Sequence, residues 1–308
     1  MLGTIVIPVY NEEDNIPILY QRLVNVMKTL PLDYEIIFVD DGSTDSSLVR
    51  IRELSRSDEN VYYISFTRNF GHEAASTAGL DAAKGDCIIL MDADLQDPPE
   101  LIPKMIELWR QGYHLVYAKR RRRAGESLFK RISAYAFYRI LNLMSDLKFP
   151  LDTGDFRLMD KVVVEDFKKC REKNRFVRGL TAWVGYNQVG IEYDRDERYA
   201  GRTKYNPLKL LLLSIDVITG FSIVPLRIVT YAGFLITALS LCMTLIVIIQ
   251  KIFFGLNIPG YALLTSGLFF LGGVQTFFLG ILGEYVGRIY REVQKRPLYL
   301  IQEQRLKN

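Results

Sequence analysis

The residues best suited to chemistry form a short acidic cluster, Asp92-Ala93-Asp94, directly after an apolar run at residues 87–91. If the run is a strand, both carboxylates point to the same side, because side chains alternate along a strand. Carboxylate oxygens placed in this way suit a hard cation such as Mg²⁺ or Mn²⁺, which usually takes substrate phosphates as further ligands. Taken alone, the cluster would be interpreted as a solvated turn before the helix that Pro98 and Pro99 open. A metal site is favoured only if other parts of the chain supply matching groups.

The surrounding chain alternates between apolar strands and helices. Strands are expected at residues 4–9, 34–39, 61–66, 87–91 and 115–118. One helix is expected to follow the loop at residues 10–15 and to end near residue 29. Three others are expected to span residues 71–83, 98–111 and 127–143. Several strands are continuous runs of β-branched and aliphatic residues, which is typical of strands buried on both faces. The alternation therefore predicts an α/β fold with a mostly parallel sheet.

Distinctive polar residues follow four of these strands. They are Tyr10 to Glu12, Asp40-Asp41, Arg68-Asn69 and Asp92-Ala93-Asp94. Ligands of open parallel sheets bind outside the carboxyl ends of the strands, so these groups should share one edge. Three acidic turns with a basic residue at the fourth strand end favour a site for a nucleotide and a metal ion. The net charge of +4 is too small to indicate nucleic acid, and the three cysteines lack metal or disulfide spacing.

Three motifs resemble the signature of family 2 glycosyltransferases, which have a Rossmann-like GT-A fold. They are Ile7-Pro8-Val9-Tyr10-Asn11-Glu12, Val39-Asp40-Asp41-Gly42-Ser43-Thr44-Asp45 and Asp92-Ala93-Asp94-Leu95-Gln96-Asp97-Pro98. Three further features narrow the resemblance to one group within this family. Two are the motifs Arg68-Asn69-Phe70-Gly71 and Thr153-Gly154-Asp155-Phe156-Arg157-Leu158-Met159, and the third is the pair of apolar helices near the C-terminus. Together these features are similar to the polyprenyl-phosphate glycosyltransferases. That group includes dolichol-phosphate mannose synthase and the bacterial undecaprenyl-phosphate (bactoprenol) glucosyltransferases.

The resemblance implies a nucleotide-sugar site at the strand ends. Its members are Pro8, Tyr10, Glu12, Val39, Asp41, Arg68, Asp92 and Ala93. It also implies a metal site in which Asp92, Asp94 and the Gln96 carbonyl bind Mg²⁺ or Mn²⁺, and Asp94 counts among the catalytic residues. Asp40 could either cap a helix or contact the ligand.

Two basic segments are candidates for the acceptor side. The run Lys119 to Arg123 follows the fifth expected strand and is itself followed by Lys130-Arg131. The loop Arg198 to Tyr205 precedes the apolar last third of the chain. The first could also be a solvated face or a contact with anionic lipid headgroups, and the second a charged linker. The resemblance instead implies that basic side chains here hold a lipid phosphate, for which arginine forks are well shaped. The matching residues are Arg120, Arg131, Arg202 and Lys204.

Asp155 lies in a polar, glycine-containing stretch between apolar elements, residues 153–157. The resemblance implies that it is the catalytic carboxylate. A lipid phosphate is already largely ionised near neutral pH, since its second pKa is about 6. Asp155 is therefore expected either to orient the acceptor or to remove a residual proton, and a capped turn is the structural alternative. His72 and His114 have no evident partner ligands and are assigned no role.

The last third of the chain carries two uncharged stretches, residues 228–250 and 261–283, each long enough to cross a membrane as a helix. Residues 206–224 mix apolar side chains with Lys209 and Asp216, which favours a helix lying in the membrane interface. Basic residues flank the outer ends of the pair, so the positive-inside rule places both ends and the N-terminal domain in the cytoplasm. A buried hairpin in a soluble protein is the weaker alternative.

These patterns predict four parts of the chain. They are a GT-A catalytic domain at residues 1–205, an interfacial helix at 206–225, a two-helix transmembrane hairpin at 226–285 and a cytoplasmic tail at 286–308. The resemblance implies metal-dependent, inverting transfer of a hexose from a nucleotide sugar, UDP-glucose by expectation, to undecaprenyl phosphate. The reaction is expected at the cytoplasmic face of the inner (plasma) membrane, where it would supply a lipid-linked sugar for cell-surface glycans. A homo-oligomer, a tetramer by resemblance, is also expected.

Two other functions are compatible with the same fold. A processive glycan synthase would need more membrane helices and usually a Gln-x-x-Arg-Trp motif, which the sequence lacks. A non-catalytic membrane scaffold would be free to lose its metal carboxylates, yet Asp92, Asp94 and Asp155 are all present.

Overall fold

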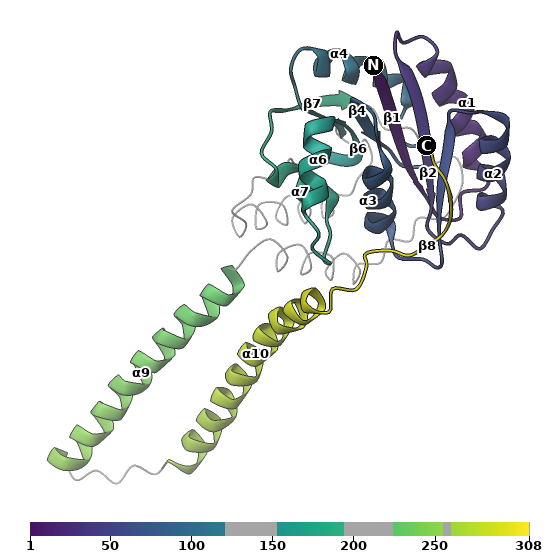
Figure 1. Cartoon of the computed structure of the whole chain (residues 1–308). Coiled ribbons are helices and arrows are strands. Elements are labelled where there is room, and N and C mark those ends of the chain that lie inside the picture. The colour runs from purple at the N-terminus through teal and green to yellow at the C-terminus, as the bar shows by residue number, and fades with distance from the viewer. Residues whose placement is uncertain (121–152, 194–223, 255–259, 308) are drawn as a thin grey trace. The chain divides into compact units, whose positions relative to one another are not determined.

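The computed structural model describes residues 1–120, 153–193, 224–254 and 260–307 (Figure 1). The chain divides into two compact units. The first contains a sheet with its covering helices and includes the C-terminal residues from Arg296. The second contains two long helices, α9 (Val224–Phe254) and α10 (Tyr261–Val293). Several sequence predictions lie outside the described residues: Arg131, Arg202, Lys204 and the helices at 127–143 and 206–224.

A mixed, eight-stranded sheet forms the framework of the first unit. Its strands are β1 (Leu2–Val9), β2 (Asp33–Asp40), β3 (Val61–Phe66), β4 (Cys87–Leu90), β5 (Leu115–Arg120), β6 (Thr153–Asp160), β7 (Gln188–Tyr193) and β8 (Ile301–Arg305). Their order across the sheet is β7-β5-β6-β4-β1-β2-β3-β8. Strands β6 and β8 run antiparallel to their neighbours, and the other pairs are parallel. Because β6 is antiparallel to both β4 and β5, strands β1 to β5 all point the same way and share one carboxyl edge.

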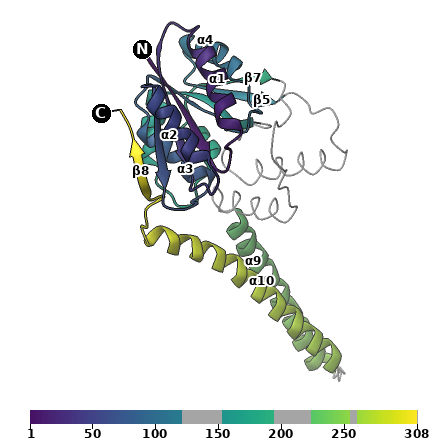
Figure 2. The same cartoon turned by 90° about the vertical axis from the view of Figure 1, so that its right-hand side faces the viewer.

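Helices cover both faces of this sheet (Figure 2). They are α1 (Asn15–Met27), α2 (Ser47–Ser57), α3 (His72–Ala82), the 3₁₀ turn η1 (Pro99–Leu101), α4 (Ile102–Arg110), α6 (Lys161–Lys169) and α7 (Val177–Trp183). Ile36 and Phe38 of β2 enter the core shared with α1 and α4, whereas Ile37 and Val39 enter a second core shared with α3. The unbroken apolar sequence of β2 follows from this arrangement, because both faces of the strand are buried.

The five predicted strands are all present, with ends within two residues of the predicted bounds. The helix predicted at 98–111 begins as η1 and continues as α4. The sheet is mostly parallel, as predicted, and β6 lies antiparallel between β4 and β5. Residues 153–157 were expected between elements, but they form the first half of β6. No apolar run marks this strand, because it contains the buried charged residues Asp155 and Arg157, which are 5% and 3% exposed.

The C-terminal residues also adopt more structure than the sequence suggests. The pattern predicts a tail from residue 286, but α10 continues to Val293 and residues 301–305 form β8. β8 lies at the edge of the sheet (Figure 2). It pairs with β3, and Gln304 lies opposite Ile64. Most of its side chains are exposed, so no apolar alternation marks it as a strand.

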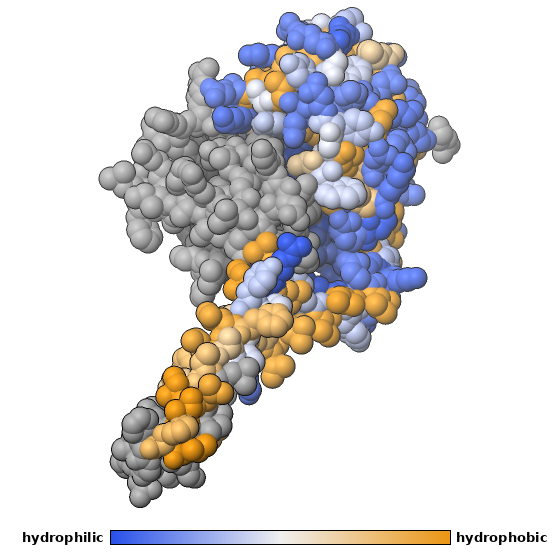
Figure 3. Space-filling model, turned by 90° about the vertical axis from the view of Figure 1, so that its left-hand side faces the viewer, coloured by the Kyte–Doolittle hydropathy of each residue, from blue (hydrophilic) through white to orange (hydrophobic). Residues whose placement is uncertain are grey.

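The two long helices present large apolar side chains to their surroundings (Figure 3). Phe234, Phe253 and Leu264 are 72%, 76% and 75% exposed. Within the described part of the chain, one segment, Phe270–Val293, is long and apolar enough to cross a membrane, and α9 holds a shorter apolar segment, Val224–Ser240. The predicted pair of spanning helices is therefore supported in part.

Candidate active site

The carboxyl edge of the sheet opens into a cavity of about 390 Å³. Segments that follow β1, β2, β3 and β4 line it, as the sequence predicts, and the first half of β6 joins them. The lining residues are Pro8, Val9, Tyr10, Glu12, Asp41, Asn69, Gly71, His72, Ala75, Asp92, Ala93, Asp94 and Asp155. Carboxylates from distant parts of the chain therefore meet around one space.

Most residues predicted to hold a nucleotide sugar line this cavity. They are Pro8, Tyr10, Glu12, Asp41, Asp92 and Ala93. Two others do not belong to the lining. Val39 is fully buried in the core beneath α3. Arg68 places its Cζ 3.9 Å from the centre of the Phe70 ring and donates a hydrogen bond to the Asn69 carbonyl.

Asp41 holds the loop after β3 in place. Its carboxylate accepts hydrogen bonds from the backbone N–H groups of Phe70 at 2.7 Å and Gly71 at 3.0 Å. Burial raises the pKa of Asp41, although these two N–H groups oppose the rise. The next residue, Gly42, has a φ of +66°, and a Cβ there would lie 2.5 Å from the backbone of Arg68. Only glycine permits so close an approach of the two loops.

Asp40 stabilises the same turn through hydrogen bonds on the buried side of the loop. It is 1% exposed and accepts hydrogen bonds from the Ser43 N–H at 3.1 Å and the Ser65 hydroxyl at 2.9 Å. Helix α2 begins later and has Ser46 at its N-cap position. Asp40 therefore shapes the turn that presents Asp41 and is absent from the cavity lining.

The loop after β4 carries the predicted metal ligands. Asp92 and Asp94 line the cavity, and the Gln96 N–H donates to Asp94 Oδ1 at 3.2 Å. Leu95 has a φ of +61°, a left-handed conformation that is uncommon for a residue other than glycine. Backbone strain of this kind clusters at ligand-binding loops, so Leu95 supports a functional role for the turn.

Antiparallel pairing brings Asp155 to this loop. β6 pairs with β4 so that Leu90 lies opposite Arg157, and the same register continued by two residues places Asp155 beside Asp92. Arg178 of α7 binds both carboxylate oxygens of Asp155, with Nε 2.7 Å from Oδ1 and Nη2 2.6 Å from Oδ2. This bidentate pair fixes the orientation of the Asp155 carboxylate.

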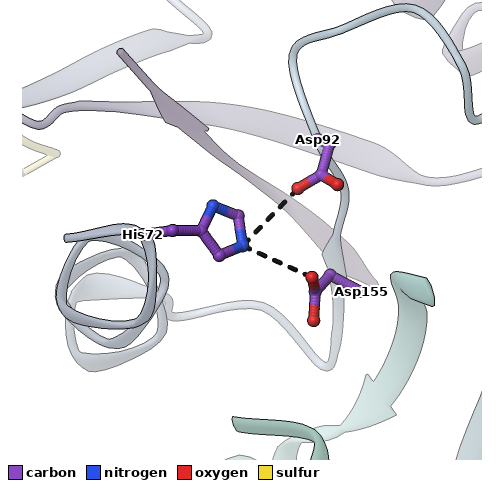
Figure 4. A group of neighbouring side chains, drawn as sticks. All are labelled: His72, Asp92 and Asp155. Atoms are coloured by element: carbon purple, nitrogen blue, oxygen red, sulfur yellow. Dashed lines mark ion pairs between the residues drawn. The ribbon is translucent and has the colours of Figure 1, made fainter. Parts of the chain in front are cut away.

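His72 begins α3 and approaches two of the acidic side chains (Figure 4). Its Nε2 lies 3.6 Å from Asp92 Oδ1 and 3.5 Å from Asp155 Oδ2. Burial alone would lower the pKa of His72, but the hydrogen bond to Asp155 and the charge of Asp92 raise it by more. The expectation that His72 lacks partners is therefore wrong, because its imidazole lies next to Asp92 and Asp155. The imidazole adds positive charge to this acidic cluster.

The sequence motifs did not indicate the contacts that two arginines make in the site. Arg178 fixes Asp155, and Arg157, which is 3% exposed, donates to the Gly154 carbonyl at 2.9 Å. Arg178 approaches from a helix late in the domain, and no local spacing indicates its partner. His72 offered a usable signal, because it directly follows a loop at a strand end.

The acidic cluster fits a divalent cation. Burial raises the pKa of Asp92 to about 7; His72 opposes the rise, and nearby carboxylates, Asp155 first among them, add to it. Asp92 Oδ1 is buried and accepts no hydrogen bond from the described residues. A cation would relieve this crowding of carboxylates, and oxygen ligands suit Mg²⁺ or Mn²⁺. By distance His72, Asp92 and Asp155 could also hold an ion, but Arg178 already binds both oxygens of Asp155.

An α/β sheet with an Asp-x-Asp cluster at its carboxyl edge has the architecture of the GT-A class. The chain belongs to glycosyltransferase family 2: the model of that family, "Glycosyl transferase family 2", matches residues 4–167. A second family model, "GtrB C-terminal hairpin", matches residues 224–289. The family expected from the sequence motifs is thereby confirmed.

Several relatives match nearly the whole chain. The uncharacterized glycosyltransferase YkcC of Bacillus subtilis is 50% identical, over 97% of this chain and 93% of its own. The SfII prophage-derived bactoprenol glucosyl transferase of Shigella flexneri is 44% identical, and a prophage bactoprenol glucosyl transferase homolog of Escherichia coli K12 is 45% identical, each with 97% of both chains covered. Among solved structures, glucosyl-3-phosphoglycerate synthase of Mycobacterium tuberculosis overlaps 71% of this chain and 77% of its own. Its identity of 20% and TM-score of 0.48 make this likeness too loose to bear on ligands.

Proposed function

We propose that this protein transfers glucose from UDP-glucose to undecaprenyl phosphate at the cytoplasmic face of the plasma membrane. The observation that carries the proposal is the single cavity in which Asp41, Asp92, Asp94 and Asp155 meet. Similarity over nearly the full length to two relatives named as bactoprenol glucosyl transferases supports glucose as the sugar and a polyprenyl phosphate as the acceptor.

The donor would occupy the cavity at the carboxyl edge. Its volume of about 390 Å³ lies within the range of small-molecule sites, roughly 300–1,000 Å³. Tyr10 is 42% exposed at its rim, so the ring is accessible to a nucleoside. Pro8, Glu12 and Asp41 complete this side of the cavity. We assign the nucleoside to this side and the diphosphate to the side of Asp92.

Asp92, Asp94 and the Gln96 carbonyl are the proposed ligands of Mg²⁺ or Mn²⁺. A bound ion of this kind would neutralise charge on the departing diphosphate. The left-handed turn at Leu95 holds the ligand residues in one compact loop. His72 stands beside Asp92 and limits the repulsion among the carboxylates.

In the proposed reaction, an oxygen of the lipid phosphate attacks the anomeric carbon of the sugar. The bond from that carbon to the diphosphate oxygen breaks, and the nucleoside diphosphate leaves with the electron pair. Because the attack comes from the face opposite the leaving group, the anomeric centre is inverted. Because the lipid phosphate is largely ionised near neutral pH, with a second pKa of about 6, the step needs little proton removal. Positioning and charge neutralisation would then provide most of the rate enhancement.

Asp155 is suited to orienting the acceptor. Burial alone would raise the pKa of Asp155, but the charge and hydrogen bonds of Arg178 hold it well below its usual range. A carboxylate this weakly basic removes a proton poorly. Its carboxylate is instead held in one orientation at the edge of the cavity, where it can help to align the acceptor phosphate and the sugar. Of the two roles expected from the sequence, we propose the orienting one.

Arg120 is the proposed contact to the lipid phosphate within the described residues. It ends β5, and the carboxyl end of β5 shares the edge of β4 because β6 is antiparallel to both. This placement supports the assignment. Arg131, Arg202 and Lys204 are proposed as further phosphate contacts from the family resemblance.

Two membrane crossings fit the path of the chain. The chain leaves the first unit before α9, and after α10 residues 301–305 return to the same sheet as β8. If α10 crosses a membrane, the chain must cross it an even number of times between these points. Phe270–Val293 is a candidate for one crossing, and we propose α9 for the other. The match to a C-terminal hairpin over residues 224–289 supports this pairing.

Transfer to two acceptors tests the proposal. The full-length protein would be incubated in detergent with UDP-[¹⁴C]glucose, Mg²⁺ or Mn²⁺, and either undecaprenyl phosphate or undecaprenol. We expect label to enter the lipid fraction only with the phosphorylated acceptor. Absence of transfer to undecaprenyl phosphate, or equal transfer to undecaprenol, would overturn the proposed function.

A further inference from the structure

The C-terminal residues are tied into the first unit at several points outside the cavity. β8 pairs with β3, and the Thr67 N–H donates to the Leu300 carbonyl at 3.1 Å. Tyr299 and Leu306, on either side of β8, pack against the core that the sheet shares with α3. Glu303 forms an ion pair with Arg52 at 2.7 Å. The segment Tyr299 to Leu306 is therefore anchored by side chains as well as by strand pairing.

Tyr299 makes the most specific of these contacts. Its ring stacks on Phe66, with centroids 5.1 Å apart and planes 12° from parallel. Its hydroxyl donates to Asp81 Oδ2 at 2.9 Å, at the far end of α3. Phe66 is the last residue of β3, so Tyr299 packs directly beneath the loop that leads to the cavity.

Phe66 connects this packing to the cavity. Its ring meets the Phe70 ring edge-on, with centroids 5.7 Å apart and planes at 87°. The Phe70 N–H donates to Asp41 at 2.7 Å, and Asp41 and Gly71 both line the cavity. An unbroken series of contacts therefore runs from Tyr299 to the side of the cavity assigned to the nucleoside.

We propose that the C-terminal segment Tyr299 to Leu306 is a positioning element for donor binding. By packing on Phe66, Tyr299 fixes the Phe70 ring and with it the loop whose N–H groups hold Asp41. This inference rests on the proposed donor site and adds a distant residue that shapes it. Only residues 294–298 separate Tyr299 from the end of α10 at Val293.

A simpler task for β8 would be to cover the exposed edge of β3. Edge covering needs only backbone pairing and is indifferent to the side chain at residue 299. The positioning role depends on the Tyr299 ring, because that ring contacts Phe66. The two roles therefore predict different results for substitutions that leave β8 paired.

Binding of UDP and UDP-glucose to the full-length protein separates these roles. Tyr299→Ala removes the stacked ring and should weaken nucleotide binding by about two- to thirtyfold, the range spanned by couplings through packed networks. The KM for undecaprenyl phosphate should stay the same, and hydrogen exchange at the Phe70 and Gly71 amides should become faster. Tyr299→Phe keeps the ring and should remain near the wild type. Gln302→Ala, at an exposed position of β8, is the matched control and should change nothing.

If Tyr299→Ala lowers the yield of folded protein, the ion pair provides a milder test. Glu303→Arg places like charges together and should weaken UDP binding, and adding Arg52→Glu should restore it. Unchanged UDP affinity in folded Tyr299→Ala, failure of the charge reversal to restore binding, or an equal rise in the KM of donor and acceptor would overturn the inference. A wild-type protein that binds no UDP would instead contradict the proposed function itself.

Discussion

Asp94 provides the residue-level test of the metal site. Asp94→Asn keeps the shape of the side chain and can still accept from the Gln96 N–H, but it removes the negative charge of a proposed metal ligand. We expect transfer to be abolished while the thermal unfolding curve stays close to that of the wild type. Asp14→Asn is the matched control, because Asp14 is exposed and its side chain caps no helix. Full activity of Asp94→Asn, or of the wild type in excess EDTA, would contradict the metal assignment.

Arg178 and Asp155 should behave as one functional unit. Replacing Arg178 with Met removes the two hydrogen bonds that orient Asp155, and each charge-assisted bond is worth about 1.5–3 kcal/mol. We therefore expect kcat to fall tenfold or more, with Arg178→Lys intermediate because it keeps the charge without the fork. In a double-mutant cycle with Asp155→Asn, the double variant should be no slower than Asp155→Asn alone. Fully additive losses would show that Arg178 acts independently of Asp155.

The sequence was informative about some site residues and silent about others. Asp92 and Asp94 follow a strand directly, so their place at the carboxyl edge could be predicted from local pattern. Arg178 could not, because it reaches Asp155 through the packing of α7, and no spacing along the chain encodes that contact. His72 lies between these cases, since its position after a strand-end loop was visible although its partners were not.

At the scale of elements, the end of strand β5 and the basic residues after it are predicted to bind the acceptor phosphate. Replacing Arg120 or Arg131 with Ala should raise the KM for undecaprenyl phosphate or lower kcat, because each would remove a proposed contact to the lipid phosphate. Nucleotide binding, measured by calorimetry, should change little. Lys119→Ala is the control on the same strand, because Lys119 is paired with Glu192 of β7 at 3.7 Å. A fall in UDP affinity would move the two arginines to the donor site.

Two strands show where pattern-based prediction of elements fails. β6 places charged residues inside the sheet, and Arg157 remains there because backbone carbonyls accept its hydrogen bonds. A strand with buried charges does not show the apolar run that identified β1 to β4. β8 fails for the opposite reason, since its side chains are mostly exposed and show no apolar alternation. A catalytic domain ending at residue 205 would lack this strand.

For the whole molecule, the proposed pair of membrane crossings predicts which sides of the membrane its segments reach. In a variant whose three native cysteines are replaced by Ser, a single cysteine at Asn257 should react with an impermeant probe only from outside the cell. A cysteine at Gln304, an exposed position of β8, should react only from inside, because β8 belongs to the sheet of the first unit. Labelling of Gln304 from outside would contradict both the even number of crossings and the cytoplasmic location of the site.

The central claim is that an oxygen of the lipid phosphate displaces the whole nucleoside diphosphate from the sugar. The most direct measurement uses UDP-glucose labelled with ³H in the sugar and ³²P in the β-phosphate, with unlabelled undecaprenyl phosphate and the full-length protein. We predict that the lipid product gains ³H without ³²P and that UDP, carrying the ³²P, is released in equal amount. Appearance of ³²P in the lipid, or absence of ³H from it, would contradict this account.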